Sequence, residues 1–223
     1  MNIVTVKWGD KYGVDDVNKL YYSIVNMLQW GENENDIQFY CYTDDSIGLN
    51  PHIHWLPLID LDLDGVWNKL ALFKPGMLPE GKWLYLDLDV IIQGRLDEIY
   101  MQNQFTMVKC YWKPIEQLKS DWLMEGRTVM DHNINSSVML FWNDENYHIW
   151  EHFFQDPDDY MMAYPGIDGF LYCEGLAPEN YWKQGRIYSK YFGIKEESWY
   201  NPPDEPYYLE TAAICLLNGP FKI

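Results

Sequence analysis

Near its middle the chain reads Lys82-Trp83-Leu84-Tyr85-Leu86-Asp87-Leu88-Asp89-Val90-Ile91-Ile92, an apolar, strand-forming run interrupted by two carboxylates. Residues two apart on an extended backbone point to the same side, about 7 Å apart. Asp87 and Asp89 can therefore converge on one cation where the chain bends out of a sheet. A buried carboxylate pair without a cation would be costly. Because oxygen ligands suit hard divalent ions, this segment predicts a Mn²⁺ or Mg²⁺ site. The simpler alternative is that both residues end a strand and cap a turn.

Strand-like and helix-like segments alternate along the rest of the chain. The strands are expected at residues 3–6, 37–42, 53–56, 105–111, 137–142 and 212–217. The helices are expected at residues 14–28, 66–73, 96–100 and 144–154, whereas 179–187 is ambiguous. This alternation predicts an α/β fold with a mostly parallel mixed sheet flanked by helices on both sides. The length of 223 residues fits one domain spanning 1–223. Ligands of such sheets bind beyond the carboxyl ends of the strands, and the two carboxylates follow such an end.

The composition excludes several classes of partner. A net charge of −18 opposes nonspecific binding of nucleic acid or of anionic membranes. No apolar stretch is long enough to span a membrane, and the first residues lack the apolar core of a signal peptide. The scattered cysteines form no C-x-x-C pair and are expected to be reduced core thiols: Cys41, Cys110, Cys173 and Cys215. We therefore expect a cytoplasmic protein with no nucleic-acid partner and no membrane span.

Three other polar patterns imitate a functional site. The acidic alternation at residues 60–64 follows a short apolar piece and is expected to be a solvated loop. His148 and His152 match the H-x-x-E-H metalloprotease pattern, but a helical wheel turns both toward solvent. The apolar face of that helix is expected to comprise Tyr147, Trp150, Phe153 and Phe154. His52 and His54 alternate on a strand, where surface exposure is favoured over a zinc site.

Several segments, taken in order, resemble the glycosyltransferase A-fold (GT-A) enzymes, in particular the glycogenin and lipopolysaccharide galactosyltransferase superfamily with its phage and large-virus relatives. These segments are Val4–Gly9, Asn18–Tyr21, Phe39–Asp45, Trp67–Phe73, Leu84–Asp89 and Ile134–Leu140. Together they cover most of the chain. The most specific part is the D-x-D pair in its strand setting.

The resemblance implies a nucleotide-diphospho-sugar transferase fold and metal-dependent transfer of a hexose. The donor would be a nucleoside diphosphate sugar, most readily UDP-linked, and the acceptor an unknown hydroxyl. By this resemblance Asp87, Asp89 and Asn218 are the metal ligands, and Asn135 and Asp168 are the catalytic residues. The implied donor-binding residues are Val6, Lys7, Trp8, Gly9, Lys69, Asp87, Leu88, Asn135, Gly219 and Lys222.

The chain departs from the family pattern at two places. Asn218 stands where the family has a histidine metal ligand, and an amide oxygen ligates a hard cation more weakly. Asp168 is the one carboxylate in Pro165–Phe170, where the family has a richer acidic and glutamine-containing cluster. Two other functions therefore stay open. One is a noncatalytic nucleotide-sugar or carbohydrate-binding protein of the same fold. The other is a haloacid dehalogenase-type phosphatase with Asp87 as nucleophile and Asp89 as acid/base.

Overall fold

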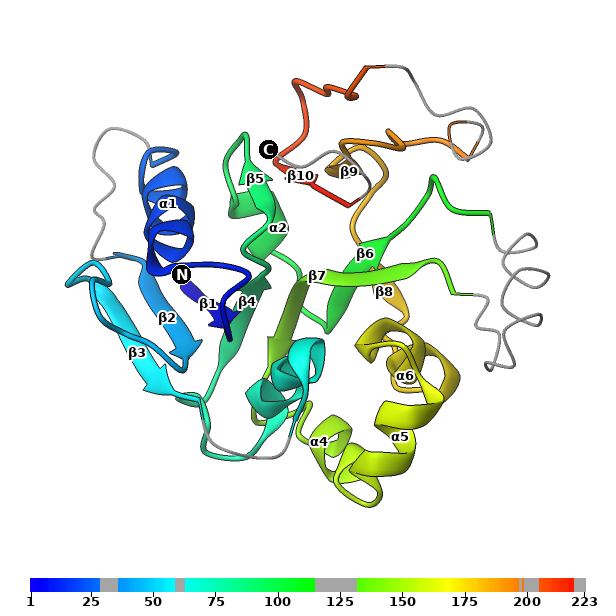
Figure 1. The fold of residues 1–223 in the computed structure, drawn as a ribbon. Coiled ribbons are helices and arrows are strands. Elements are labelled where there is room, and N and C mark those ends of the chain that lie inside the picture. Colours follow the sequence, from blue (N-terminus) through cyan, green and yellow to red (C-terminus); the bar gives the residue numbers. More distant parts are fainter. Residues whose placement is uncertain (29–35, 59–62, 115–131, 197, 199–204, 219–223) are drawn as a thin grey trace.

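The computed structural model describes the chain except for residues 29–35, 59–62, 115–131, 197, 199–204 and 219–223. Its strands form two sheets: seven strands in the order β3-β2-β1-β4-β7-β6-β8 and three in the order β5-β10-β9 (Figure 1). The strands of the larger sheet are β1 (Asn2–Lys7), β2 (Gln38–Thr43), β3 (Ile53–Pro57), β4 (Lys82–Leu86), β6 (Thr106–Lys109), β7 (Ile134–Trp142) and β8 (Asn180–Tyr181). Those of the smaller sheet are β5 (Val90–Ile92), β9 (Ile187–Ser189) and β10 (Ile214–Leu216). The helices are α1 (Val14–Val25), the 3₁₀ helix η2 (Gly65–Phe73), α2 (Asp97–Tyr100), α4 (His148–Phe153), α5 (Pro157–Ala163) and α6 (Ile167–Cys173).

The larger sheet is mixed and mostly parallel, as predicted. Strands β3, β2, β1 and β4 pair in parallel, and so do β6 and β8. Strand β7 alone in this sheet runs antiparallel to both of its neighbours, β4 and β6, among the described residues. The first residues of β7 therefore lie at the same edge of the sheet as the last residues of β1, β4, β6 and β8. This edge collects the candidate site residues.

Alternating side chains of the central strands enter two separate cores. Ile3 and Leu84 belong to the core that α1 covers, whereas Val4 and Tyr85 belong to the core that η2, α4 and α6 cover. Figure 1 shows α1 and the α4–α6 group on opposite sides of the larger sheet. Burial of each large apolar side chain contributes about 1.5–3 kcal/mol. The predicted two-sided α/β architecture is confirmed.

The segment 82–92 divides between the two sheets. Strand β4 ends at Leu86, and β5 begins at Val90 and pairs antiparallel with β10, opposite Leu216. The Asp87–Asp89 turn is therefore the crossing from one sheet to the other. The amide of Asp87 donates to the carbonyl of Ser137 over 2.8 Å, which holds the start of this turn against β7.

Several predicted segments differ from the structure. The helix expected over 144–154 is the shorter α4. Strand β7 begins at Ile134, because backbone pairing with β6 extends the strand through the polar Asn-Ser-Ser sequence. Helices α5 and α6 were not predicted; α5 is short and none of its side chains is fully buried, so its sequence has no clear helical apolar stripe. The ambiguous 179–187 segment contains β8 and the first residue of β9.

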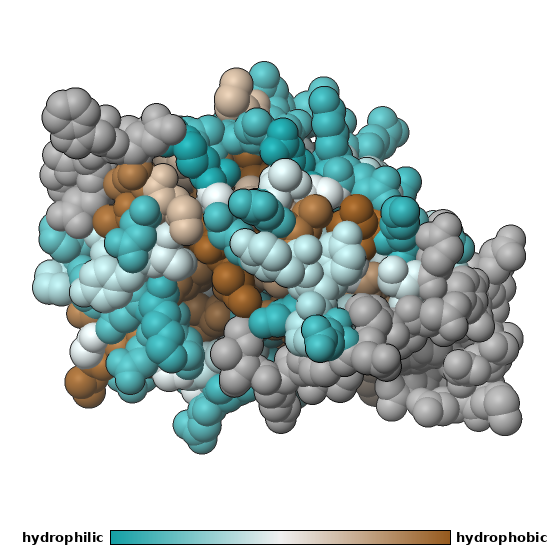
Figure 2. Space-filling model, turned by 90° about the horizontal axis from the view of Figure 1, so that it is seen from above, coloured by the Kyte–Doolittle hydropathy of each residue, from teal (hydrophilic) through white to brown (hydrophobic). Residues whose placement is uncertain are grey.

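Some hydrophobic residues are exposed at the surface despite the high net charge. Figure 2 looks from above the view of Figure 1 and shows hydrophobic residues reaching the surface between hydrophilic ones. Within the described part of the chain, no helix is long and apolar enough to cross a membrane.

Candidate functional site

Asp87 is held by a buried lysine and a buried tyrosine. The ammonium of Lys69 lies 2.7 Å from Oδ1 and 2.9 Å from Oδ2, and the hydroxyl of Tyr85 donates a short hydrogen bond to Oδ1. The side chains of Lys69 and Asp87 are 6% and 17% exposed, so water screens this ion pair little. Burial, and then the charge of Asp87, raises the pKa of Tyr85 well above its usual value. The tyrosine therefore acts as a hydrogen-bond donor.

Lys69 reaches Asp87 because η2 is almost wholly buried beneath the sheet. Residues Trp67 to Phe73 are all buried, and the amide of Asn68 bonds the carbonyls of Leu63 and Gly65. In a 3₁₀ helix residues i and i+3 lie on one line, so a single line of side chains, which includes Lys69, can face the end of β4. The structure thus brings the predicted Lys69 and Asp87 together.

Asp89 has different partners and is more exposed. Its Oδ2 accepts a hydrogen bond of 2.8 Å from the hydroxyl of Tyr12 and lies 4.0 Å from the ammonium of Lys11. Its side chain is 36% exposed. Burial, followed by the hydrogen bond to Asp89, raises the pKa of Tyr12. Sequence reasoning missed Tyr12; its place in the loop directly after β1, at the ligand-binding edge, is the signal that could have found it.

Asn218 lies beside this turn. The amide of Leu217 donates to the carbonyl of Asp89 over 3.3 Å, which extends the β5–β10 pairing to the residue before Asn218. The side-chain oxygen of Asn218 is buried and has no hydrogen-bond partner in the structure as described. An unpaired buried amide oxygen is costly unless a ligand satisfies it.

The donor set around the turn fits a hard cation. Two carboxylates and an orphaned amide oxygen are oxygen ligands of the kind that Mn²⁺ and Mg²⁺ prefer. No group of three or more His, Cys, Asp or Glu side chains able to hold a metal occurs among the described residues. The side-chain oxygen of Asn218 is therefore the candidate for a third protein ligand among the described residues.

Asn135 and Asp168 meet at the start of β7. The amide of Ser136 donates to Oδ1 of Asp168 over 2.9 Å, and the amide of Ser137 donates to Oδ1 of Asn135 over 2.9 Å. Since the carbonyl of Ser137 accepts from the amide of Asp87, one short stretch of β7 links all three candidate residues. Asp168 comes from the first turn of α6, so this unpredicted helix positions it.

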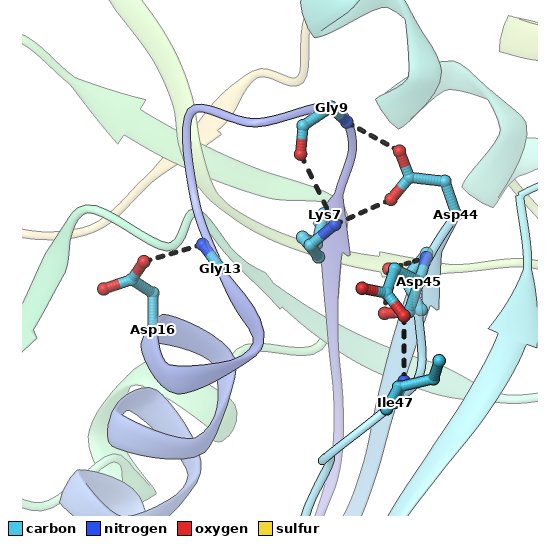
Figure 3. A network of polar contacts seen from close by, with 8 residues as sticks. Lys7, Gly9, Gly13, Asp16, Asp44, Asp45 and Ile47 are labelled. Atoms are coloured by element: carbon cyan, nitrogen blue, oxygen red, sulfur yellow. Dashed lines mark hydrogen bonds and ion pairs between the residues drawn. The ribbon is translucent and has the colours of Figure 1, made fainter.

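The end of β1 forms its own polar network (Figure 3). The ammonium of Lys7 lies 2.8 Å from Oδ1 of Asp44, and the amide of Gly9 donates to Oδ2 over 2.7 Å. Burial alone would raise the pKa of Asp44, but hydrogen bonds from Lys7 and Gly9 outweigh it and hold the pKa below its usual value. The side chain of Lys7 is therefore directed at Asp44, while Val6 is buried and Trp8 packs half-buried against the core.

The remaining predicted residues divide into two groups. Leu88 is partly buried against the core that α1 covers. Gly219 and Lys222 lie outside the described residues, and so do residues 60–62 of the acidic alternation.

The H-x-x-E-H helix corrects the predicted orientation of its second histidine. His148 is exposed, but Nε2 of His152 lies 3.0 Å from Oε2 of Glu174 and 3.0 Å from the hydroxyl of Tyr160. The hydroxyl of Tyr164 donates to the other oxygen of Glu174. The hydrogen bond from Tyr164 lowers the pKa of Glu174. Burial opposes this shift, but the hydrogen bond with His152 adds to it, so the pKa lies below its usual value. His152 therefore ties α4 to α5 and to the end of α6.

The apolar face of α4 also differs from the helical wheel. Its buried residues are Ile149, Trp150 and Phe153, because the helix begins at His148, whereas Tyr147 and Phe154 flank it and are 42% and 58% exposed.

Two further expectations can be compared with the structure. His52 and His54 are exposed, as expected. All four cysteines are free, and three of them are buried as expected. Cys173 is exposed on α6, so the prediction that it is a core thiol is wrong.

No family model matches the sequence, and no curated protein sequence matches it. Solved structures share its fold. An active-site mutant of LgtC superposes with a TM-score of 0.63 at 15% identity, over 100% of this chain and 89% of that one. The galactosyltransferase LgtC in complex with donor and acceptor sugar analogues gives 0.61 at 13% identity, over 99% and 88%. The glycosyltransferase GlyE of Streptococcus pneumoniae TIGR4 gives 0.54 at 13% identity, over 81% and 44%. The chain therefore has the GT-A type fold of these glycosyltransferases.

Proposed function

We propose that this protein is a metal-dependent glycosyltransferase that moves a hexose from a nucleoside diphosphate sugar, UDP-linked, to a hydroxyl acceptor. The observation that carries the proposal is the orphaned, buried oxygen of Asn218 beside the Asp87–Asp89 turn. Its setting in a GT-A fold supports the same conclusion. In the reaction the bond from the anomeric carbon to the diphosphate oxygen breaks. A bond to the acceptor oxygen forms, and the hydroxyl proton is lost.

Asp87, Asp89 and Asn218 would hold the cation, Mn²⁺ or Mg²⁺. When bound, such an ion neutralises the charge that builds on the leaving diphosphate. The turn offers two negative charges and one neutral oxygen to it, and one of those charges is already paired with Lys69. We therefore expect the protein alone to bind the ion weakly and the diphosphate to supply the missing ligands.

Lys69 would exchange partners when the donor binds. In the structure both oxygens of Asp87 accept from the ammonium of Lys69. A diphosphate at the turn would offer Lys69 a stronger anion and would free Asp87 for the cation. Lys69 would then help to neutralise the leaving group, as would Lys222 by the family resemblance.

Asn135 and Asp168 would orient the hexose. Each uses Oδ1 to accept a hydrogen bond from a backbone amide of β7, which leaves Oδ2 of Asp168 and the amide nitrogen of Asn135 for sugar hydroxyls. Backbone groups of residues 6–9, with Leu88 and Gly219, would contact the nucleotide. The Lys7–Asp44 pair stabilises that loop, so Lys7 would act through the loop's conformation.

A noncatalytic nucleotide-sugar-binding protein is the second candidate. Two observations favour it: the third ligand is an amide, and Asp168 is bound to β7 through one oxygen. We do not propose the phosphatase alternative. The solved structures that share this fold are glycosyltransferases, which favours the transferase over the phosphatase.

Donor turnover separates these functions. The protein is incubated with a panel of nucleoside diphosphate hexoses, with Mn²⁺ or with EDTA, and released nucleoside diphosphate and inorganic phosphate are measured. A transferase releases nucleoside diphosphate, by transfer or slow hydrolysis, only with the metal. A binding protein shows a metal-dependent rise in melting temperature without release. If the protein shows neither release of nucleoside diphosphate nor a rise in melting temperature, the proposal is contradicted.

A further inference from the structure

The order of strands arranges the candidate site residues in a line along one edge of the larger sheet. The end of β1 carries the loop of residues 6–9, the end of β4 carries Asp87, and the start of β7 carries Asn135. The next strands in the same direction are β6 and then β8, which end at this edge in Lys109 and Tyr181. In the proposed function this line runs from nucleotide to diphosphate to hexose. The acceptor would then lie at β6 and β8.

Basic and aromatic side chains gather at this end of the line. We call them the basic–aromatic edge: Lys109, Tyr111, Lys113, His132, Tyr172 and Tyr181. The ammonium of Lys109 lies 5.7 Å from the ring centre of Tyr111 and 5.6 Å from that of Tyr181. The rings of His132 and Tyr172 are 6.2 Å apart.

Backbone contacts set these residues at the open end of the β6–β7 pair. The amide of Cys110 donates to the carbonyl of Asn133, and the amide of Lys113 returns to the carbonyl of Cys110, over 2.6 and 2.9 Å. The backbone at Lys113 therefore turns back toward the start of β7, which His132 closely precedes. The hydroxyl of Tyr111 donates to the carbonyl of Trp182 over 3.1 Å, which fixes its ring beside β8.

Lys113 is a half-buried cation, and no described residue forms an ion pair with it. In the described part of the chain its ammonium makes no ion pair or hydrogen bond. Burial lowers the pKa of Lys113, and burial together with the nearby charge of Lys113 lowers the pKa of His132. The carboxylate of Asp168 opposes both shifts, so both basic groups lie near the candidate catalytic residue. A partly desolvated cation of this kind is stabilised by an incoming anion.

We infer that the basic–aromatic edge binds the acceptor, and that this acceptor is a sugar carrying a carboxylate or phosphate group. The inference rests on the proposed function. Tyrosine rings offer flat apolar faces with a polar rim, which suits the face of a sugar ring. Lys113 and Lys109 supply the cations that pair with the anionic group. The acceptor hydroxyl would then lie beside Asp168.

The test compares anionic and neutral sugars while the diphosphate site is filled. Glucuronic acid, glucose 6-phosphate and glucose are titrated into the protein with excess UDP and Mn²⁺, and binding is followed by ligand-observed saturation-transfer NMR. The variants are Lys113→Gln, the charge-conserving Lys113→Arg, and Lys195→Gln as a control that removes a charge from an exposed lysine.

We expect at least one anionic sugar to bind about tenfold more tightly than glucose, or about 1.4 kcal/mol. Lys113→Gln should remove that preference, whereas Lys113→Arg and Lys195→Gln should keep it. The anionic sugar that binds more tightly than glucose shows whether the recognised group is a carboxylate or a phosphate. Equal binding of glucose and both anionic sugars would overturn the inference, and so would an undiminished preference in Lys113→Gln.

A melting curve of the same samples separates this inference from the proposed function. A rise in melting temperature that needs both UDP and Mn²⁺ supports the proposed function, and its absence counts against that function alone. The preference for anionic sugars over glucose is measured whether or not the melting temperature rises.

Discussion

The two ends of the ligand-binding edge differ in how their lysines are neutralised. At the nucleotide end, Lys7 and Lys69 each lie within 2.8 Å of a carboxylate, that of Asp44 or Asp87. At the far end, Lys109 contacts aromatic rings and Lys113 makes no ion pair in the part of the chain that is described. Both lysines at the first end are already paired with carboxylates, so a ligand that binds them must take the place of a carboxylate. At the second end no described carboxylate forms an ion pair with Lys113, so an anionic ligand can pair with it without displacing one.

The largest expected effect comes from breaking the buried pair at the nucleotide end. Asp87→Asn leaves Lys69 buried without its counter-charge, which costs about 3 kcal/mol of unfolding free energy, and it also removes a proposed metal ligand. Urea denaturation should show the loss. A variant with unchanged stability would mean that the pair is solvated and that the contrast between the two ends is false.

Asp89→Asn should affect binding with little effect on folding. Asp89 is 36% exposed and is contacted by Tyr12 and Lys11, so its loss leaves no buried charge unpaired. We expect UDP affinity in the presence of Mn²⁺ to fall about a hundredfold, or about 2.7 kcal/mol. Isothermal titration measures it. The matched control is Asp159→Asn, which removes an equal charge from the exposed surface of α5 and should leave affinity unchanged.

Lys69→Met should sharpen the comparison by freeing Asp87 for the metal. Without the ammonium on both carboxylate oxygens, Mn²⁺ affinity in the absence of nucleotide should rise about tenfold, or about 1.4 kcal/mol. The binding of UDP should weaken, since its phosphates lose a cation. Mn²⁺ titration followed by electron paramagnetic resonance gives the affinity. A fall in nucleotide-free Mn²⁺ affinity would refute the proposed exchange of partners.

The smallest effect is expected away from the edge, at Glu174. Its lowered pKa in the folded state means that it adds stability above its unfolded pKa, and this stability is lost as pH falls through the folded value. Glu174→Gln should lower the unfolding free energy by about 1 kcal/mol at neutral pH, and the difference from the parent should vanish once the pH falls below the folded pKa of Glu174. Glu179→Gln, at an exposed position, is the control. A difference that persists in acid would assign the effect to packing.

The sequence predicted the parts of the fold that have a clean apolar period. Strands β1, β2 and β4 are apolar runs, and the Asp87–Asp89 pair stands out because it interrupts one. The same run could not reveal that β5 joins a second sheet, because an apolar pattern does not say which strand will be its partner. Helix α5 is short and has no fully buried side chain, so no clear apolar period marked it.

Side-chain partners were the least predictable feature of the candidate site. The bond from Lys69 to Asp87 and that from Tyr12 to Asp89 join residues 18 and 77 positions apart, and only the packed strands bring them together. The resemblance placed Lys69 at the donor, but the ion pair that it must give up became visible only in three dimensions.

The most direct test of the account is a calorimetric titration of Mn²⁺ into the parent protein and into Asn218→His, each with and without saturating UDP. If Asp87, Asp89 and the amide of Asn218 hold the ion together with the diphosphate, the parent should bind Mn²⁺ weakly alone and at least about tenfold more tightly with UDP. The histidine variant should gain affinity without UDP, up to about tenfold. Equal Mn²⁺ affinity with and without UDP in the parent, together with no change in the variant, would contradict the proposed metal site.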